Sequence, residues 1–262
     1  ACRDLGIVKG NEPMLQLRNQ GQILGPDGQR MSKSRGNVID PDEQVKTYGA
    51  DTVRAFLMFG YRWADGGPWD PGNIQGVNRW LNRVWITLLE DASSQNLDER
   101  ITLKLKRKTH QTLKAVTRDF REFEFNTIVS ALMELLNYME DAKRQGAFGS
   151  PVWDESVRFY LCMLAPIAPH ISEEIWHLLR YEGSVHQQKW PSVDEQAIIE
   201  DVITLVVQVN GKVRDRIEVP AGTSETEARK IALSSETVQK FLAGKEPQKT
   251  IFVPGKLINI VR

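Results

Sequence analysis

The chain has 262 residues, 41% of them apolar and 26% charged, which is enough apolar material for a hydrophobic core. Its 34 basic side chains balance 34 acidic ones, which argues against a surface that is basic throughout. Two cysteines, Cys2 and Cys162, are too few for a disulfide framework or a four-cysteine zinc site, so a reducing, cytoplasmic setting is expected. The sequence contains no apolar run of membrane-spanning length and no recognisable signal peptide.

Charge is divided unevenly along the chain. Residues 1–75 are balanced, residues 76–201 carry a net charge of −4, and residues 202–262 carry a net charge of +4. The balance of the whole chain therefore hides a basic final part, and a local nucleic-acid surface is not excluded. The length fits two or three structural units.

The first 72 residues predict an irregular segment followed by two helices. A Gly-Pro-Asp-Gly turn over residues 25–28 separates Ile23-Leu24 from Arg30-Met31, and these two stretches are expected to pair as a short hairpin. Asp40 suits the N-cap of a first helix, because Pro41 follows it at the first helical position. A second helix is predicted from Ala50 to Phe59. Its apolar face is expected to comprise Val53, Phe56 and Leu57.

Residues 73–195 show the spacing of a helical bundle. Five successive segments place apolar residues at i, i+3, i+4 and i+7, and short connections join them, which is typical of an antiparallel bundle. We expect Cys162 in its core, and His170 as a structural donor beside a helix start capped by Ser172. Core packing is also expected for four tryptophans, Trp80, Trp85, Trp153 and Trp176.

The pattern changes from helical to strand-like after residue 201. Asn210-Gly211, a strong signal for a tight hairpin, joins a β-branched stretch to an alternating one. Two short helices follow, the first opened by a capping box of Ser224 and Glu227, and a second hairpin ends the chain. Residues 202–262 thus predict a small α+β module of order β-β-α-α-β-β, and the fold class is mainly α. On the second strand, Val213, Ile217 and Val219 are expected on one face and Lys212, Arg214 and Arg216 on the other.

One loop, residues 30–37, gathers cations, hydroxyls and a glycine. Such a loop can wrap a polyphosphate, with Lys33 as a point charge and Ser32, Ser34 and backbone amides as hydrogen-bond donors. If pyrophosphate leaves from ATP at this loop, these donors stabilise the charge that grows in the transition state. On charge alone, a solvated basic turn is an equally good interpretation.

The loop also carries a family resemblance. Arg30-Met31-Ser32-Lys33-Ser34 resembles the Lys-Met-Ser-Lys-Ser signature of class I aminoacyl-tRNA synthetases, with Arg30 in place of the first lysine. That exchange keeps the charge and replaces a point cation by a planar fork. The flanking Gly36-Asn37, Asp40-Pro41 and residues 49–54 look like the region after the signature in the leucine, isoleucine, valine and methionine enzymes.

Three later stretches extend the resemblance. Residues 125–137 and 164–176 look like parts of the anticodon-binding bundle of that family. Residues 209–214 together with 253–261 resemble the C-terminal module of bacterial-type leucyl-tRNA synthetases, and this pair selects leucine within the family. Because the chain contains no His-x-Gly-His signature, nucleotide-binding core or editing domain, it looks like the C-terminal part of such an enzyme, inactive alone.

The resemblance implies a role for each part. Residues 1–72 would end the catalytic module, 73–195 would form a tRNA-binding bundle, and 202–262 would touch the tRNA corner. Lys33 would contact ATP phosphates, with Met31 also at the ATP site, and Arg30, Ser32 and Ser34 would support the mobile loop. For the tRNA contact, the residues implied are Lys212 and Arg214. The full-length enzyme would use leucine, ATP with Mg²⁺ and tRNA(Leu) as a monomer, without a membrane partner or a metal site in this segment.

Two other interpretations remain open. One is a non-enzymatic RNA-binding module derived from a synthetase, although such a module has no need of the loop from Arg30 to Ser34. The other is a valyl or isoleucyl enzyme, against which the Asn210-Gly211 hairpin module argues. A cluster of cations at residues 104–108 fits either a solvated helix face or a polyanion contact.

Overall fold

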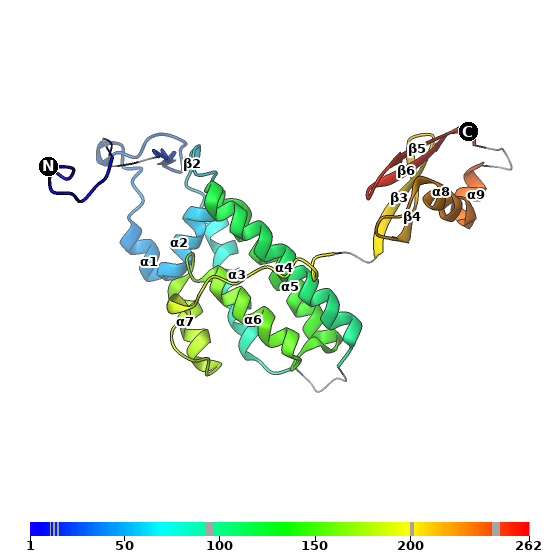
Figure 1. Ribbon diagram of the computed structural model, residues 1–262. Helices are drawn as coiled ribbons and strands as arrows, with labels where there is room; N and C mark the ends of the chain where they lie inside the picture. The colour runs from blue at the N-terminus through cyan, green and yellow to red at the C-terminus, as the bar shows by residue number, and fades with distance from the viewer. Residues whose placement is uncertain are drawn as a thin grey trace. The chain divides into compact units, whose positions relative to one another are not determined.

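The computed structural model describes residues 1–10, 12, 14, 16–92, 97–199, 202–242 and 247–261, without the side chains of residues 202 and 203. The chain divides into two compact units, Ala1–Ile198 and Ile199–Arg262 (Figure 1). Each unit has a hydrophobic core of its own. Within the module predicted at residues 202–262, residues 243–246 and residue 262 lie outside the described residues.

The first unit is mainly helical, as predicted. Its helices are α1 (Pro41–Tyr48), α2 (Ala50–Phe59), α3 (Pro71–Leu89), α4 (Glu99–Glu122), α5 (Phe125–Ala142), α6 (Pro151–Leu164) and α7 (Pro169–Leu178) (Figure 1). Single helical turns lie at Lys33–Arg35, Lys143–Ala147 and Val185–Gln187. None of the helices in the described part of the chain is both long enough and apolar enough to cross a membrane.

Local sequence explains most of the helix starts. Asp40, Asp70 and Asp98 cap α1, α3 and α4 by accepting backbone amides of the first turn, and Ser150 does the same for α6. A proline follows the cap at the start of α1, α3 and α6. These side chains pair with amides that the helix itself leaves unpaired, so the starts of these helices can be predicted from the sequence.

The cap predicted for α7 is wrong. This helix already begins at Pro169, and the Ser172 hydroxyl donates back to the carbonyl of Ala168. The helix start is held instead by Asp51 of α2, whose two carboxylate oxygens lie 2.7 Å from the Ile171 amide and 2.7 Å from His170 Nδ1. His170 is thus a structural partner, as expected, although its carboxylate comes from 119 residues away.

One core unites α2 with the later helices. Val53 and Phe56 of α2 are buried in the same cluster as the leucines of α4 and α5, and Trp69 packs edge-on against Phe56 with ring centroids 4.7 Å apart. Residues 1–72 and 73–195 therefore lie in one compact unit. Of the predicted core tryptophans, three are buried: Trp80, Trp153 and Trp176.

Two apolar residues predicted in the core are exposed instead. Trp85 is 38% exposed, because the buried stripe of α3 runs through Val84 and Leu88, and residue 85 lies beside it. Leu57 of α2 is 42% exposed and lines a small cavity described below. In both cases the apolar stripe is narrower than the sequence pattern suggests.

A parallel strand pair ties the segment that carries the loop at residues 30–37 to the helices. β1 (Gln22–Leu24) pairs with β2 (Gly66–Pro68), and the predicted hairpin is reduced to one antiparallel bridge between Leu24 and Arg30. The two backbones are so close that a Cβ built on Gly21 would lie 2.0 Å from the amide nitrogen of Gly66. Glycine is therefore required on both sides of this contact.

The second unit has the predicted order of elements. It contains β3 (Val202–Val209), β4 (Lys212–Pro220), α8 (Glu225–Ser234), α9 (Glu236–Leu242), β5 (Lys249–Val253) and β6 (Leu257–Val261). The strands form one sheet in the order β4-β3-β6-β5, with β3 and β6 parallel and the other pairs antiparallel. The Ser224–Glu227 capping box that opens α8 is present, as predicted.

A β-bulge in β4 overturns the predicted faces of that strand. Val207 pairs with Asp215 and Gln208 with Val213, so Arg214 between them has no opposite residue. Residues paired across antiparallel strands share a face, and the bulge therefore moves Val213 away from Ile217 and Val219. Val213 is 53% exposed as a result.

Candidate functional site

The phosphate-loop candidate, residues 30–37, rises from a tight turn. Gly28 donates to the carbonyl of Gly25 and the amide of Gly25 to that of Gln29, at 2.9 and 2.8 Å, which closes the turn predicted at residues 25–28. The amide of Gln29 also donates to Asp27 Oδ1 over 3.0 Å. The loop thus follows a turn whose two ends are hydrogen-bonded to each other.

The carboxamide of Asn37 closes the other end of the loop. Its Oδ1 accepts the amide of Ser32 over 2.9 Å, and its Nδ2 donates to both carboxylate oxygens of Asp27 at 3.1 Å and to the carbonyl of Arg30 at 3.3 Å. The pKa of Asp27 is lowered, first by the Gln29 amide and then by Asn37, so this carboxylate is charged at neutral pH.

The predicted loop residues divide into anchored and exposed groups. Met31 is half-buried against the core of the first unit, and Ser32 is also half-buried. Arg30, Lys33 and Ser34 are exposed. The hydroxyls of Ser32 and Ser34 lie 2.8 Å apart. The loop is thus an exposed cationic tip on an anchored base, which suits contact with an anion that arrives from solution.

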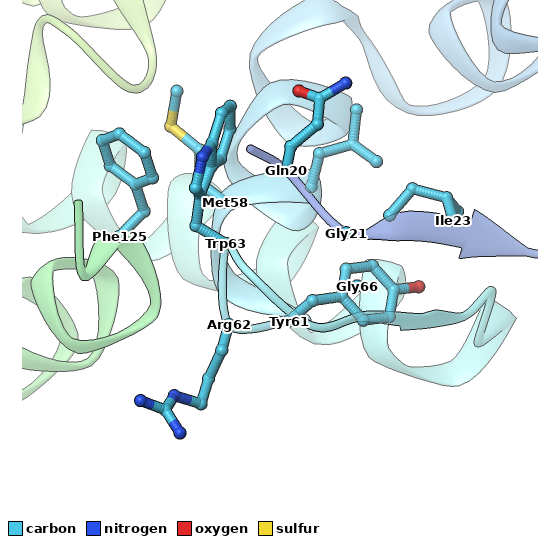
Figure 2. Close-up of a pocket in the computed structure, with 10 residues that line it drawn as sticks. Gln20, Gly21, Ile23, Met58, Tyr61, Arg62, Trp63, Gly66 and Phe125 are labelled. Atoms are coloured by element: carbon cyan, nitrogen blue, oxygen red, sulfur yellow. The ribbon is translucent and has the colours of Figure 1, made fainter. Parts of the chain in front are cut away.

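A cavity of about 240 Å³ lies where β1 and the connector after α2 meet the start of α5. Figure 2 shows the indole of Trp63 beside Met58 and Phe125, with Arg62 pointing away from them. Trp63 packs edge-on against Phe125 and Phe123, with ring centroids 5.3 and 5.8 Å apart. The cavity lies between the loop-bearing segment and the helices, and no residue of the loop at 30–37 lines it.

The cations near the start of α4 lie from the second turn onward, and two of those at residues 104–108 pair with carboxylates of this unit. Lys106 lies 2.8 Å from Asp194, and Lys108 pairs with Glu134. Lys114 further along the helix lies 2.9 Å from Glu195. Acidic side chains of the chain itself therefore neutralise Lys106 and Lys108, so these two cations do not require a polyanion as a partner.

The bulge places Lys212 and Arg214 on the helix-facing side of β4. Lys212 pairs with buried Val209 at the hairpin end, and the Arg214 guanidinium stacks 3.9 Å from the ring centroid of Phe241 on α9. Arg214 Nε has no hydrogen-bond partner in the described part of the chain. Arg216 pairs with Val206 on the opposite face and is separated from the other two.

No cluster of three metal-ligating side chains occurs among the residues that the structure describes. His110 is buried, and its Nδ1 accepts the amide of Asp194 over 3.1 Å. His177 lies 3.2 Å from Glu173 on the same helix. These contacts account for the two histidines as structural residues.

Two family models match this chain. Residues 6–65, which contain the loop, match the model described as tRNA synthetases class I (I, L, M and V). Residues 104–230, from α4 into the second unit, match the anticodon-binding domain of tRNA ligase. The two matches place a class I synthetase segment before an anticodon-binding domain, which is the order that the motifs predicted.

Similarity to individual proteins shows which amino acid the related ligases attach to tRNA. The leucine–tRNA ligase of Deinococcus radiodurans is 50% identical over 259 residues, and that of Rubrobacter xylanophilus is 53% identical over 260 residues. Each match covers 99% of this chain. The chain belongs to the leucine–tRNA ligase family. It spans about a third of the length of these relatives, 32% and 31% respectively.

A solved structure supports the same assignment for this ligase segment. The agnB2 LeuRS of Agrobacterium radiobacter K84, in a ternary complex with tRNA and LeuAMS, is 29% identical and superimposes with a TM-score of 0.81. The match covers 99% of the ligase segment and 35% of the Agrobacterium chain. Together with the 50% and 53% identical relatives, this match favours a leucyl enzyme over a valyl or isoleucyl one as the source of this segment.

Two residues of the loop base escaped the sequence analysis. Asp27 lies in a predicted turn and Asn37 follows a glycine, so each residue is explained by its own neighbours in the sequence. The contact between them is therefore not apparent from the sequence. The signal that was available is the pairing of a turn carboxylate with a carboxamide ten residues later, at the two ends of one cationic loop.

Proposed function

We propose that this chain supplies the phosphate-contacting loop and the tRNA-docking surfaces of a leucine–tRNA ligase. The whole enzyme activates leucine with ATP and transfers the leucyl group to tRNA(Leu). The observation that carries the proposal is the exposed cationic loop on an anchored base, in a chain about half identical to leucine–tRNA ligases.

In the activation step, the leucine carboxylate attacks the α-phosphorus of ATP, and pyrophosphate leaves. Negative charge grows on the leaving pyrophosphate, and Lys33 at the loop tip would stabilise it as a point charge. Arg30 would add a second cation, and Ser32 and Ser34 would donate hydrogen bonds. Met31 would keep the loop at the ATP site through its contact with the core. Mg²⁺ would enter with ATP as part of the substrate.

The rest of the chain would dock tRNA. We infer that residues 73–195 form an antiparallel tRNA-binding bundle and residues 202–262 a module that touches the tRNA corner, while residues 1–72 complete the catalytic module. The anticodon-binding match over residues 104–230 and the tRNA present in the Agrobacterium complex support this division. The enzyme would act as a cytoplasmic monomer.

Within the second unit, Lys212 and Arg214 are the proposed phosphate contacts. Stacking on Phe241 would orient the Arg214 guanidinium and leave its outer amines for a phosphate oxygen. Lys212 lies two residues away at the exposed hairpin end. Arg216 is not included, because it pairs on the other face of the sheet.

Replacing Lys212 and Arg214 together by alanine is expected to weaken tRNA(Leu) binding and flatten its salt dependence. Each lost phosphate contact removes about 0.7 to 0.9 from the slope of log affinity against log salt concentration, so the double variant should lose roughly 1.4 to 1.8. Filter binding at several salt concentrations measures both quantities. Arg229→Ala with Lys230→Ala on α8 is the matched control for loss of two positive charges, and an unchanged slope in the Lys212 and Arg214 double variant would exclude these contacts.

A further inference from the structure

The contact between Asn37 and Asp27, here called the loop latch, joins three parts of the chain. Through it the turn at residues 25–28, the entry to the loop at Arg30 and the amide of Ser32 all meet one carboxamide. The carboxamide oxygen and nitrogen of Asn37 are both engaged, at 2.9 to 3.3 Å. A single side chain therefore closes the ring of backbone that carries Lys33.

The surroundings hold the latch in one geometry. A Cβ built on Gly25 would lie 2.7 Å from Asp27 Oδ1 and 2.9 Å from Asn37 Nδ2, so only glycine leaves room for the pair. The amide of Gln29 holds the same Asp27 oxygen from the other side. Neither side chain can shift far without losing contacts to the backbone.

The loop tip has little other support. Apolar anchors hold it at Met31 and Ile39, which pack against the core, while the residues from Lys33 to Gly36 are exposed and form one short helical turn. Ordering an exposed residue costs conformational entropy of about 1–2 kcal/mol, so unanchored residues sample many positions. Asn37 contacts the backbone of Arg30 and Ser32, which directly precede Lys33 in the chain. These contacts limit the positions that Lys33 can sample.

We propose that Asn37 and Asp27 are positioning residues for leucine activation, and that their latch sets where Lys33 is presented to the leaving pyrophosphate. The inference rests on the proposed function of the loop. Neither residue needs to touch ATP, because the effect passes through the backbone of residues 30–33. A catalytic group displaced by about 1 Å can lose on the order of 100-fold in rate, which sets the scale of the effect.

The test uses a full-length ligase that carries this segment, with single-turnover formation of leucyl adenylate as the readout. Asn37→Ala should lower the rate constant about 10- to 100-fold and leave the KM for ATP nearly unchanged, because the aligned loop matters most in the transition state. Asn73→Ala on the exposed face of α3 is the control for loss of an asparagine and should activate leucine normally.

Exchange of partners tests the contact itself. Asn37→Asp places two carboxylates where the 3.1 Å contacts lie, and it should slow activation at least as much as Asn37→Ala. Adding Asp27→Asn restores a carboxamide facing a carboxylate, so the double variant should recover part of the lost rate. No recovery in the double variant, with both proteins folded by circular dichroism, would overturn the latch.

Hydrogen exchange at the Ser32 amide separates this inference from the proposed function. Asn37→Ala should accelerate that exchange about tenfold or more, whether or not the loop acts in catalysis. Slow activation by Lys33→Ala together with normal activation by Asn37→Ala would overturn the latch alone. Normal activation by both variants would overturn the proposed function of the loop, and with it the positioning role. If Asn37→Ala does not fold, Asp27→Asn and the double variant decide the question.

Discussion

Replacing Lys33 by alanine is expected to slow leucyl-adenylate formation about 100-fold in a full-length ligase that carries this segment. The size follows from the loss of one donor aimed at charge that develops in the transition state. Lys33 lies on the exposed turn Lys33–Arg35, away from the hydrophobic core, so its removal should leave the fold intact. Rapid-quench measurement of adenylate formation in a single turnover gives the rate constant directly.

Two further variants sharpen the Lys33 experiment. Lys33→Arg keeps the charge on a planar fork and should give an intermediate rate, because the point-charge geometry is lost. Lys46→Ala removes an exposed lysine of α1 outside the loop and should activate leucine at the normal rate. A normal rate for Lys33→Ala would show that the loop is a solvated basic turn, the alternative that the charge pattern allows.

The second large effect is expected at Gly66. Its φ of +65° disfavours any residue with a side chain, and an added Cβ would lie 2.2 Å from the carbonyl oxygen of Gln22. Gly66→Ala should therefore break the β1–β2 pairing at a cost of about 3 kcal/mol. That energy corresponds to roughly 100-fold faster hydrogen exchange at the Trp69 amide, which donates to the carbonyl of Leu24 over 2.9 Å.

Gly149 provides the control for backbone strain. Its φ is +76°, but an added Cβ would meet no atom within 4 Å. Gly149→Ala should therefore cost only about 1–2 kcal/mol, without effect on the exchange of Trp69. Equal behaviour of the two alanine variants would mean that the close approach of β1 to β2 does not hold the loop segment to the helices.

Much of the fold follows from local signals. Asp40 and Pro41 mark the start of α1, Ser224 and Glu227 that of α8, and Asn210-Gly211 the β3–β4 turn, because each feature satisfies backbone groups or dihedral angles within a few residues. The cationic loop was likewise visible, since its chemistry lies in consecutive residues. The family assignment rested on such short motifs and was confirmed by the comparisons.

The rest depends on contacts that no local pattern contains. The α7 start is held by Asp51 from α2, and β1 pairs in parallel with a strand some 40 residues later. The bulge at Arg214 shifts the alternation of β4 by one residue, so every face assigned on its hairpin side was reversed. Arg214 thereby meets Phe241, a contact that the strand pattern alone would not suggest.

We propose that this segment completes a leucine-activating enzyme through its loop. Leucine-dependent exchange of pyrophosphate into ATP tests it most directly, on the chain alone and on the chain joined to the remaining part of a related leucine–tRNA ligase. We expect no exchange by the chain alone, and exchange with leucine but not valine by the joined protein. Exchange by the chain alone, or no exchange by a folded joined protein, would show that the segment does not complete the enzyme in this way.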